Sequence, residues 1–541
     1  MSEQFDQCRM YFPQYRRGRP GVGLFEGTIL DHARKLGIAI DAECNGRGTC
    51  GKCVVRVERG ARALSMPTAA EKSFDLGEGE RLACQAQVVA AADLYVYVVS
   101  AGDYTILSDS VRHELELDPA VRAVDGRVLW TGDDEERDLG QYDGHVYGLA
   151  IDVGTTTVVC EVLDLETGEV LATAARKNPQ SAYGDDVISR IDHTLRNEDG
   201  LKHLQMTAAS CVNEMLEEFA ERDRIRPEQI YEVVAVGNPT MRNLFFGLEV
   251  EPLGVLPFEP PSTEAVNSEA AALELHVNPR ANVYGPALIG GHAGADCLAD
   301  IIAARMHRAE KPCLIIDIGT NGEVAVGNRE RIMTASCAAG GAYEGATVGS
   351  GVGAIAGAIS NVAIDDGKVT WETIGNEPPV GICGSGLIDL LGELLQSGIM
   401  TPKAKLSEDF QLTNDICLTQ QDVYQLITAK AGLRTDQDLL IEYYGIEPED
   451  IDKIYLAGAF GNYISVENSV AIGLLPDLPD RVVKIGNAAL AGAAEMLLSQ
   501  TVRRDSEVCA AEIEHVKPNE LEPEFDFLVA DNMYFLGALT V

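Results

Sequence analysis

Short alternating runs of apolar and polar residues divide the first hundred residues into strands and one helix. Residues 8–12, CRMYF, alternate in the way that a half-buried strand does. Within GTILDHARKLGI (27–38), apolar side chains recur on one helical face, and Thr28 with Asp31 forms a capping pair at its start. The runs VVRVE and DLYVYVV predict two further strands. This order of elements is typical of a small β-grasp domain.

Longer apolar runs begin at Gly148 and predict a second, larger architecture. The run GLAIDVGTTTVVCEVLDLETGEVLATAA has the pattern of strand, tight turn, strand, hairpin and strand. The pattern returns 165 positions later in CLIIDIGTNGEVAVGNRERIMTAS, where Asp317 and Gly319 stand in the places of Asp152 and Gly154. An internal repeat of this kind predicts a duplicated fold.

These patterns together predict a multidomain chain of the α+β and α/β classes. Residues 1–103 form the β-grasp domain, and residues 146–541 form the duplicated domain. The two halves of the duplicated domain are expected at about 146–310 and 311–541. Residues 104–145 contain the acidic run DDEERD and only short apolar runs, so they are predicted to be a solvated linker.

Composition and charge narrow the class of protein. The 541 residues are 46% hydrophobic and 23% charged, an ordinary globular balance. Lys and Arg number 43 against 84 Asp and Glu, for a net charge of −41. This argues against a nucleic-acid partner, because a phosphate backbone requires a positive surface. The sequence shows neither a secretory leader pattern nor an apolar run of membrane-spanning length, so a cytoplasmic protein without membrane contact is expected.

Four of the 13 cysteines have the spacing of a metal-binding loop. Cys44, Cys50 and Cys53 give C-x5-C-x2-C, and Cys84 follows in RLACQ. Four thiolates suit either zinc or an iron–sulfur cluster, but zinc ribbons usually use two C-x2-C pairs and only one is present. Three ligands in a glycine-rich loop with a distant fourth resemble a [2Fe–2S] ferredoxin of the adrenodoxin-like spacing, over residues 1 to about 103. Zinc remains the alternative.

Each hairpin of the repeat carries residue types that suit a phosphate group. An aspartate at the end of a buried strand can hold Mg²⁺ through water, and a glycine two positions later lets a phosphate approach the backbone. The following amide and hydroxyl groups bind phosphate oxygens, so two facing hairpins would clamp the β- and γ-phosphates. A third element, DKIYLAGAFGNYIS (452–465), is a strand ending in Gly458-Ala459-Phe460-Gly461, where an adenosine can pack on the backbone.

In this order the three elements resemble the phosphate 1, phosphate 2 and adenosine motifs of the sugar kinase/Hsp70/actin (ASKHA) superfamily, with two ribonuclease-H-like subdomains. A ferredoxin domain joined to such an ATPase resembles the reductive activators of corrinoid proteins. The resemblance covers nearly the whole chain and is carried by AECNGRGTCGKC, RLAC, LAIDVGTTT, IIDIGTNGE, ICGSGLIDLL and YLAGAFGNYIS. Members of this family have a separate middle domain, which looks absent or reduced here, because only residues 104–145 separate the ferredoxin from the ATPase.

The resemblance implies ATP-dependent reductive activation of a corrinoid methyl carrier, in which one electron from the [2Fe–2S] cluster converts Co(II) to Co(I). It implies ATP, Mg²⁺ and the cluster as cofactors, an upstream low-potential electron donor, a role in anaerobic methyl transfer, and a homodimer. Asp152 and Asp317 would position Mg²⁺ and the attacking water, and Glu323 would orient that water. The residues expected to bind the nucleotide are Gly154, Thr155, Thr156, Gly319, Thr320, Asn321, Gly384, Ser385, Gly458 and Gly461.

Two other functions fit parts of the sequence. One is a small-molecule kinase of the ASKHA type with a regulatory ferredoxin domain, and the other is a nucleotide-driven binding or chaperone module. Neither gives the four-cysteine loop a redox task, and replacing Cys50 by Ala separates a pure binder from an electron carrier. His292, between glycines in GGHAGAD, is expected to have a structural role beside the cleft.

Overall fold

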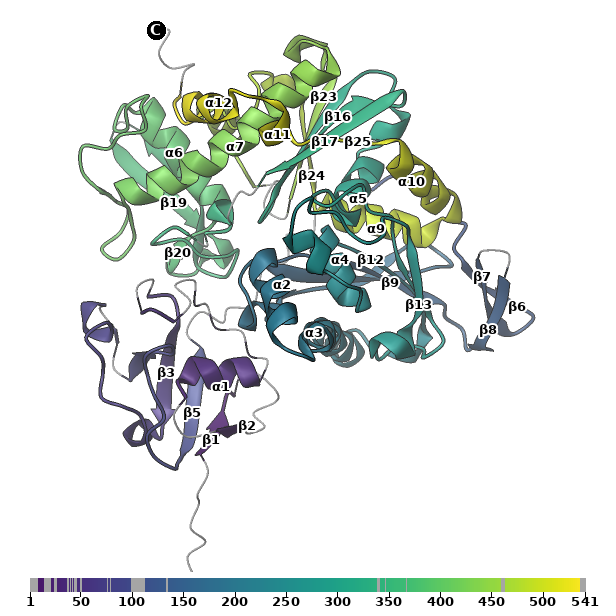
Figure 1. Ribbon diagram of the computed structural model, residues 1–541, viewed down its shortest axis with the longest axis horizontal. Coiled ribbons are helices and arrows are strands. Elements are labelled where there is room, and N and C mark those ends of the chain that lie inside the picture. Colours follow the sequence, from purple (N-terminus) through teal and green to yellow (C-terminus); the bar gives the residue numbers. More distant parts are fainter. Residues whose placement is uncertain are drawn as a thin grey trace, which may run out of the picture. The chain divides into compact units, whose positions relative to one another are not determined.

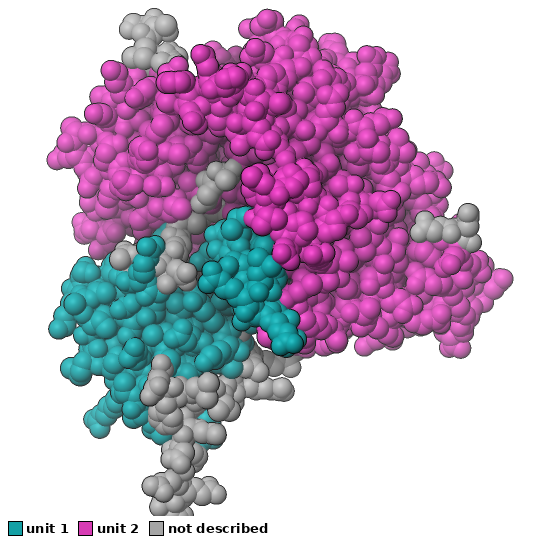
Figure 2. All heavy atoms as spheres, in the orientation of Figure 1, with its two compact units in different colours: residues 1–103, 177–200 teal, residues 104–176, 201–541 magenta. Residues whose placement is uncertain are grey.

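A computed structural model describes the chain in two compact units (Figure 2). One unit comprises residues Met1–Asp103 and Lys177–Gly200, and the other comprises Tyr104–Arg176 and Leu201–Val541. The described residues are 8–13, 21–23, 27–36, 38, 40, 42, 46–48, 51–74, 76–77, 79–98, 112–132, 135–337, 341–345, 347–365, 367–458 and 463–535.

The N-terminal domain is a mixed sheet with one packed helix (Figure 1). The strand order is β2-β1-β5-β3-β4, with β1 parallel and β3 antiparallel to β5. Helix α1 begins at the expected capping box of Thr28 and Asp31 and buries Ile29, Leu30 and Ala33 against the sheet. The elements are β1 (Cys8–Tyr11), β2 (Gly21–Gly23), α1 (Ile29–Lys35), β3 (Val54–Arg59), β4 (Glu80–Leu82) and β5 (Asp93–Val98). This is the β-grasp arrangement that the alternation predicted.

The segment predicted to be a solvated linker is partly folded. Strands β6 (Val121–Val124), β7 (Arg127–Gly132) and β8 (Glu135–Gln141) form an antiparallel sheet. Val128 and Trp130 are buried in one core with residues of the larger domain. The linker prediction is therefore wrong for these residues, because the apolar face is short and becomes a core only against its neighbour.

Two six-stranded sheets share an order of five strands and confirm the duplicated architecture (Figure 1). The sixth strand differs: β13 lies beside the fifth strand of the first sheet, whereas β25 lies beside the third strand of the second. The first sheet has the order β11-β10-β9-β12-β14-β13, and the second has the order β25-β17-β16-β15-β23-β24. In each half the first two strands form an antiparallel hairpin, the fourth strand is parallel to the first, and the fifth is parallel to the fourth. This is the ribonuclease-H-like order, present twice.

The strands of the two repeated motifs and of the segment 452–465 follow the predicted runs, whereas the other strands of these sheets were not predicted. In the first sheet the strands are β9 (Tyr147–Val153), β10 (Thr157–Asp164), β11 (Val170–Lys177), β12 (Ile230–Val236), β13 (Val266–Glu269) and β14 (Asn282–Gly285). In the second sheet they are β15 (Cys313–Ile318), β16 (Gly322–Asn328), β17 (Arg331–Cys337), β23 (Lys453–Ala457), β24 (Val482–Gly486) and β25 (Glu514–His515).

Helices and smaller sheets surround the two large sheets. The helices of this unit are α3 (Gly200–Arg222), α4 (Pro239–Phe246), α5 (Ala295–Ala303), α6 (Gly384–Gln396), α7 (Gln420–Tyr444), α8 (Val466–Ala471), α9 (Ala488–Leu498), α10 (Gln500–Glu512), α11 (Pro518–Leu521) and α12 (Phe525–Asn532). Helix α2 (Val187–Arg196) belongs to the first unit. The smaller sheets contain β18 (Ala358–Asp365), β19 (Lys368–Thr373) and β20 (Gly381–Ile382), and β21 (Phe410–Gln411) with β22 (Cys417–Leu418). Among the described residues, no helix has both the length and the apolar character needed to span a bilayer.

Helices α5 and α9 connect the two halves. Helix α9 follows the fifth strand of the second half, yet it packs on β9 and β12 of the first. Helix α5 follows the fifth strand of the first half, and its Cys297 and Ile301 lie in the core that contains Ile315 of the second. The two helices touch so closely that a Cβ on Gly492 would lie 2.2 Å from the carbonyl oxygen of Ala299. The small residues of α9 therefore serve this close packing.

Candidate functional site

The first predicted phosphate hairpin joins β9 to β10. Asp152 lies near the end of β9, and its Oδ2 accepts a hydrogen bond of 2.9 Å from Nδ2 of Asn487. Thr155, in the turn, accepts a hydrogen bond of 3.0 Å at Oγ1 from Nδ2 of Asn238. Each asparagine also caps a helix through its Oδ1, Asn487 at α9 and Asn238 at α4. Burial raises the pKa of Asp152 to about 6, although the Asn487 amide opposes the shift.

The second predicted hairpin joins β15 to β16. Asp317 lies directly opposite Glu323 in the register of the two strands, and Glu323 is only 8% exposed. Burial raises the pKa of Asp317, and it raises the pKa of Glu323 strongly, with the charges of Asp296 and Asp317 adding to the shift. Both carboxyl groups are thus shielded from solvent.

The two hairpins meet at their tips. The hydroxyl groups of Thr156 and Thr320 are 2.9 Å apart, although 164 positions separate the two residues in the chain. Gly154 and Gly319 keep the turns tight: a Cβ on Gly154 would lie 2.6 Å from the Thr157 carbonyl oxygen, and the Gly319 amide donates to the Asn321 carbonyl over 3.0 Å. The structure therefore brings together most of the residues expected to bind phosphate.

Two aspartates that the sequence prediction missed belong to the same cluster. Asp296 lies in the first turn of α5, and its pKa is raised to about 7, mainly by burial, with the charges of Asp152 and Asp317 adding. Asp300, one turn later, is 1% exposed, and burial followed by the charge of Asp317 raises its pKa well above the usual range. Their i, i+4 spacing in an otherwise apolar helix was the available signal.

The glycine that ends the adenosine motif's strand has a counterpart in the first half. Gly458 follows β23 with a φ of +108°, and a Cβ there would lie 2.5 Å from the Ile318 carbonyl oxygen and 2.9 Å from Oδ1 of Asp317. Gly237 follows β12, and its Cβ would lie 2.8 Å from the Val153 carbonyl oxygen. Each glycine thus lets the fourth strand of its half pass beside the hairpin aspartate. Gly461 lies outside the described residues.

Gly384 and Ser385 are at the start of α6. Ser385 is 1% exposed, and its hydroxyl donates a hydrogen bond of 2.8 Å to the carbonyl of Ser360 in β18. That hydroxyl therefore holds α6 against β18. Their part in nucleotide binding stays a prediction.

His292 is packed between rings. Its ring lies 5.7 Å from that of Phe258, edge on, and is stacked on the ring of His515 at 6.2 Å between ring centres. Burial lowers the pKa of His292, so the ring is neutral at neutral pH. The aromatic contacts agree with the structural role that the sequence suggested.

Two of the four predicted cluster cysteines lie within the described residues. Cys53 and Cys84 are 1% and 6% exposed, and both belong to the core of the N-terminal domain. The Cys53 thiol is the main cause that lowers the pKa of Cys84 to about 6, and the Gln85 amide and the Gly48 backbone amide assist. Cys44 and Cys50 lie outside the described residues.

The loop beside these cysteines has the backbone of a cluster-binding loop. Gly46, Gly48 and Gly51 all have φ between +71° and +83°, which favours glycine. The Gln85 side chain donates a hydrogen bond of 3.0 Å to the Gly46 carbonyl, and a Cβ on Gly51 would lie 2.5 Å from the ring of Phe74. Donors directed at buried sulfurs and a loop with three glycines in left-handed conformations fit a [2Fe–2S] cluster.

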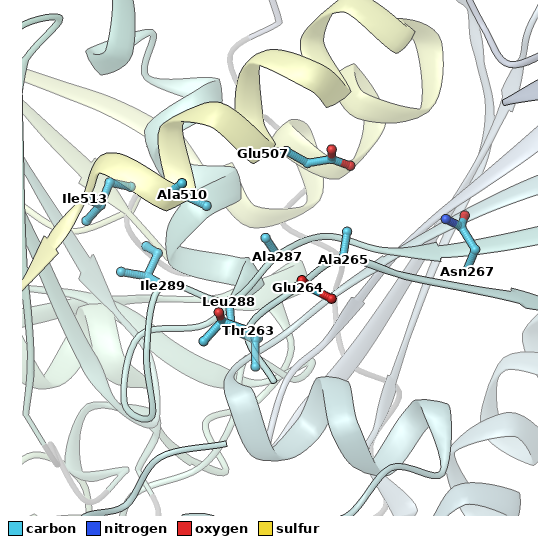
Figure 3. A pocket seen from close by; sticks show the side chains of 11 residues that line it. Thr263, Glu264, Ala265, Asn267, Ala287, Leu288, Ile289, Glu507, Ala510 and Ile513 are labelled. Carbon is cyan, nitrogen blue, oxygen red and sulfur yellow. The ribbon is translucent and has the colours of Figure 1, made fainter. Parts of the chain in front are cut away.

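A pocket of about 570 Å³ lies apart from these residues, between α10 and the segments around β13 and β14 (Figure 3). The carboxylates of Glu264 and Glu507 contribute to its lining, together with small apolar side chains such as Ala287. It contains none of the predicted nucleotide residues, and its carboxylates would repel a phosphate group. The converging hairpins, and not this pocket, are therefore the candidate nucleotide site.

Comparisons with known proteins agree with this arrangement. The C-terminal domain of RACo, described as the ASKHA domain, matches residues 311–536, the RACo middle region matches 147–309, and a 2Fe–2S iron–sulfur cluster binding domain matches 25–89. The corrinoid activation enzyme RamQ of Eubacterium limosum is 30% identical over 90% of this chain and 92% of its own length. The chain belongs to the RACo family.

Three other similar proteins extend the comparison. A [Co(II) methylated amine-specific corrinoid protein] reductase of Methanosarcina barkeri is 28% identical over 66% of this chain and 71% of its own length. The solved structure of a reductive activator for corrinoid, iron–sulfur protein is 26% identical, covers 98% of both chains and has a TM-score of 0.73. A 2Fe–2S ferredoxin of Aquifex aeolicus is 33% identical over 14% of this chain and 84% of its own.

The family match corrects one expectation about the domains. The middle region of RACo was expected to be absent or reduced, but it matches residues 147–309. In this chain those residues form the first ribonuclease-H-like sheet and its helices. The expectation was wrong because it looked for a separate domain in residues 104–145, whereas the matching region is one half of the duplicated fold.

Proposed function

We propose that this protein uses ATP to reactivate a corrinoid protein, converting its cobalt from Co(II) to Co(I) with one electron delivered through the ferredoxin domain. The main observation behind the proposal is that the hydroxyl groups of Thr156 and Thr320 meet, so that two phosphate-type hairpins face each other across one site. The same chain also contains the cysteine loop. The relatives that cover most of the chain are named as activators or reductases of corrinoid proteins. This favours reductive activation over a kinase or a chaperone.

The buried carboxyl groups beside the hairpins support a place for Mg²⁺ in this proposal. Both side-chain oxygens of Asp300 and Oδ1 of Asp317 are buried, and within the described ranges no amide, hydroxyl or cationic group is paired with these atoms. The two carboxyl groups instead lie against each other. Buried carboxylates without partners are unfavourable, and Mg²⁺ prefers oxygen ligands of this kind. In the proposal, Asp152 and Asp317 hold Mg²⁺ beside the phosphates, and Glu323 orients a water molecule. When bound, Mg²⁺ supplies positive charge that neutralises the phosphate oxygens.

The hairpin residues bind and orient the nucleotide in this proposal. Thr155 and Thr156 present hydroxyl groups at the first hairpin, and Gly319, Thr320 and Asn321 present backbone and side-chain groups at the second. Gly154 leaves room for a phosphate, and the strand end at Gly458 leaves room for the adenosine. Gly384, Ser385 and Gly461 complete the proposed set.

In the N-terminal domain, Cys44, Cys50, Cys53 and Cys84 hold the [2Fe–2S] cluster in this proposal. When bound, the cluster supplies a one-electron carrier. Clusters of plant-type ferredoxins have potentials of about −400 mV, and each further 59 mV is a factor of about ten in a one-electron equilibrium. In this proposal the reduction of Co(II) to Co(I) is uphill from the cluster, and ATP supplies the missing free energy through closure of the two halves.

Several further expectations belong to the same proposal. A low-potential protein donor reloads the ferredoxin domain, the protein acts in the cytoplasm in anaerobic methyl transfer, and it works as a homodimer. Light scattering of the purified protein tests the dimer directly. A monomer at all accessible concentrations would contradict that part alone.

The deciding experiment is anaerobic. The full chain, with its cluster reduced, is mixed with a Co(II) corrinoid protein with and without Mg-ATP, and the Co(I) absorption band is followed. We expect the band to grow only with ATP. The variant Cys84→Ser should lose both cluster and reduction while it keeps nucleotide binding, and Cys417→Ser is the matched control at a cysteine outside the loop. ATP turnover with a reduced cluster but no Co(I), with several corrinoid proteins, would point to a different acceptor.

A further inference from the structure

Helices α5 and α9 both begin at the candidate nucleotide site. Asn487, the N-cap of α9, donates its side-chain amide to Asp152 over 2.9 Å. Asp296, in the first turn of α5, is close enough to Asp152 and Asp317 for their charges to raise its pKa. A shift in the position of Asp152 therefore acts directly on the first turn of α9, and the first turn of α5 lies beside the same carboxyl groups.

The far ends of the same helices contact the segment that follows the ferredoxin domain in the sequence. We call residues 112–120 the tether. Nε2 of His113 donates a hydrogen bond of 2.9 Å to the carbonyl of Ala303, the last residue of α5. The amide of Asp118 donates over 3.0 Å to the carbonyl of Leu498, the last residue of α9. The tether is thus attached to the ends of both helices.

The start of α10 completes the attachment. The Gln500 amide donates to the Asp118 carbonyl over 2.8 Å, so that Asp118 and Ser499 pair like two parallel strands. The Gln500 side chain also approaches the Pro119 carbonyl at 3.5 Å. These contacts involve backbone groups at the boundary of α9, so a shift of α9 moves the tether as well.

Between its two ends the helix pair is rigid. Every residue of α9 is buried, and the contact of Gly492 with Ala299 leaves no space between the helices. Arg305, just beyond α5, forms an ion pair of 3.2 Å with Glu495 of α9. Closely packed interiors transmit displacement and do not absorb it. An 11-residue helix is about 16 Å long, so one rigid pair spans the distance from the hairpins to the tether.

We infer that α5 and α9 transmit nucleotide occupancy from the hairpins to the tether of the ferredoxin domain, with Asn487 and His113 as positioning residues at opposite ends. The inference rests on the proposed nucleotide site. A bound nucleotide draws Asp152 and Asp317 together and so shifts the first turns of α5 and α9. Because the tether is bonded to the last residues of the same helices, it moves with them. Electron delivery then depends on ATP because the placement of the tether depends on it. By linkage, the state of the tether changes nucleotide affinity by the same factor.

The first test measures the tether itself. Hydrogen–deuterium exchange is followed on the full, cluster-containing chain, alone, with Mg-ADP and with a non-hydrolysable Mg-ATP analogue, while calorimetry records binding. We expect the amide exchange of peptides containing Asp118 and Gln500 to change with nucleotide. Binding without any change there would overturn the coupling and leave the proposed function standing. Absence of binding would overturn both.

The second test separates coupling from folding. In the double variant His113→Ala with Gln500→Ala, two side-chain contacts of the tether are lost at a distance from the hairpins. We expect its ATP stimulation of Co(II) reduction to fall at least about fivefold, the lower end of typical coupling factors, while cluster content and melting temperature stay near those of the parent. Glu116→Ala, an exposed change on the same tether, is the matched control. Unchanged stimulation in the double variant would overturn the coupling.

A wedge between the helices gives an independent check. Gly492→Ala places a Cβ against the Ala299 carbonyl and should change the exchange of the tether even without nucleotide. Nucleotide affinity should change in the same variant, because coupling is reciprocal. Altered affinity with an unaltered tether would count against transmission through this helix pair.

Discussion

The two phosphate-type hairpins share one backbone plan but hold their carboxylates differently. In the first, Asp152 and Thr155 each receive a hydrogen bond from an asparagine that caps a helix. In the second, Asp317 has the carboxyl group of Asp300 nearby in place of an amide. The first hairpin is therefore preorganised by neutral donors, whereas the second is surrounded by acidic groups.

This difference indicates what each half contributes. A carboxylate held by an amide keeps its orientation whether or not a cation is present. A group of buried carboxylates is unfavourable until a cation joins it, so its arrangement depends on what is bound. The second half is thus the part of the site that should respond most to the arrival of Mg²⁺ and nucleotide, and the first half should respond less.

The largest expected effect comes from neutralising each aspartate. Asp152→Asn and Asp317→Asn should each lower ATP turnover by about 100-fold or more, because each removes a proposed Mg²⁺ position. The melting temperature of the nucleotide-free protein, measured in the presence of a chelator, should differ between the two variants. Asp317→Asn should stabilise more, since it removes a buried charge from an acidic group. Phosphate release measures ATP turnover, and thermal melting measures stability. Equal stabilisation by the two substitutions would contradict the proposed difference between the two hairpins.

The next effect concerns the paired glycines. Gly458→Ala introduces a Cβ at 2.5 Å from a carbonyl oxygen, at a φ of +108°. Gly237→Ala introduces one at 2.8 Å without a left-handed backbone. Gly458→Ala should lower the free energy of unfolding by about 1–3 kcal/mol more than Gly237→Ala, because backbone strain adds to the steric contact. Denaturant unfolding of both variants decides this, and a larger loss for Gly237→Ala would contradict it.

A smaller effect should be confined to the second half at low pH. Burial, aided by the charges of His292 and Lys517, lowers the pKa of His515 in β25 to about 4. The unfolded chain, with an ordinary histidine pKa, binds more protons between about pH 6.5 and pH 4. Stability of the second sheet should therefore fall across this window as the pH falls, by at most about 1.4 kcal/mol per pH unit.

Exchange measurements at several pH values distinguish the halves. Peptides of β17 should lose protection before peptides of β10, and His515→Gln should reduce the difference. A parallel loss in both sheets of the parent protein would show that His515 does not set the order.

The smallest expected effect concerns the two asparagines. Asn238→Ala and Asn487→Ala each remove a helix cap worth about 1 kcal/mol. Only Asn487→Ala also removes the donor of Asp152, so it should raise the pKa of that carboxyl and make the first hairpin resemble the second. Calorimetry of Mg-ADP binding at pH 6 and pH 8 should then show a stronger pH dependence for Asn487→Ala than for Asn238→Ala. Identical profiles would mean that the amide does not set the pKa.

The sequence was sufficient for features that depend on near neighbours. The strands and tight turns around Asp152 and Asp317, the capping box at Thr28, and the repeat itself are local patterns, and the structure contains them. The four-cysteine spacing identified the N-terminal domain for the same reason. Short-range patterns of this kind are set by backbone geometry and by the periodicity of side chains.

Only the tertiary structure placed Asn487, Asp296 and Asp300 beside the hairpins. Asn487 is 335 positions from Asp152, and nothing in its own neighbourhood marks it as more than a helix cap. Likewise, the apolar residues of β7 form a core only against the larger domain, so residues 104–145 had the composition of a linker. A single sequence records which residues favour a strand or a cap. Which of them meet depends on sheet register and on the crossing of α5 and α9, and these result from packing the whole chain.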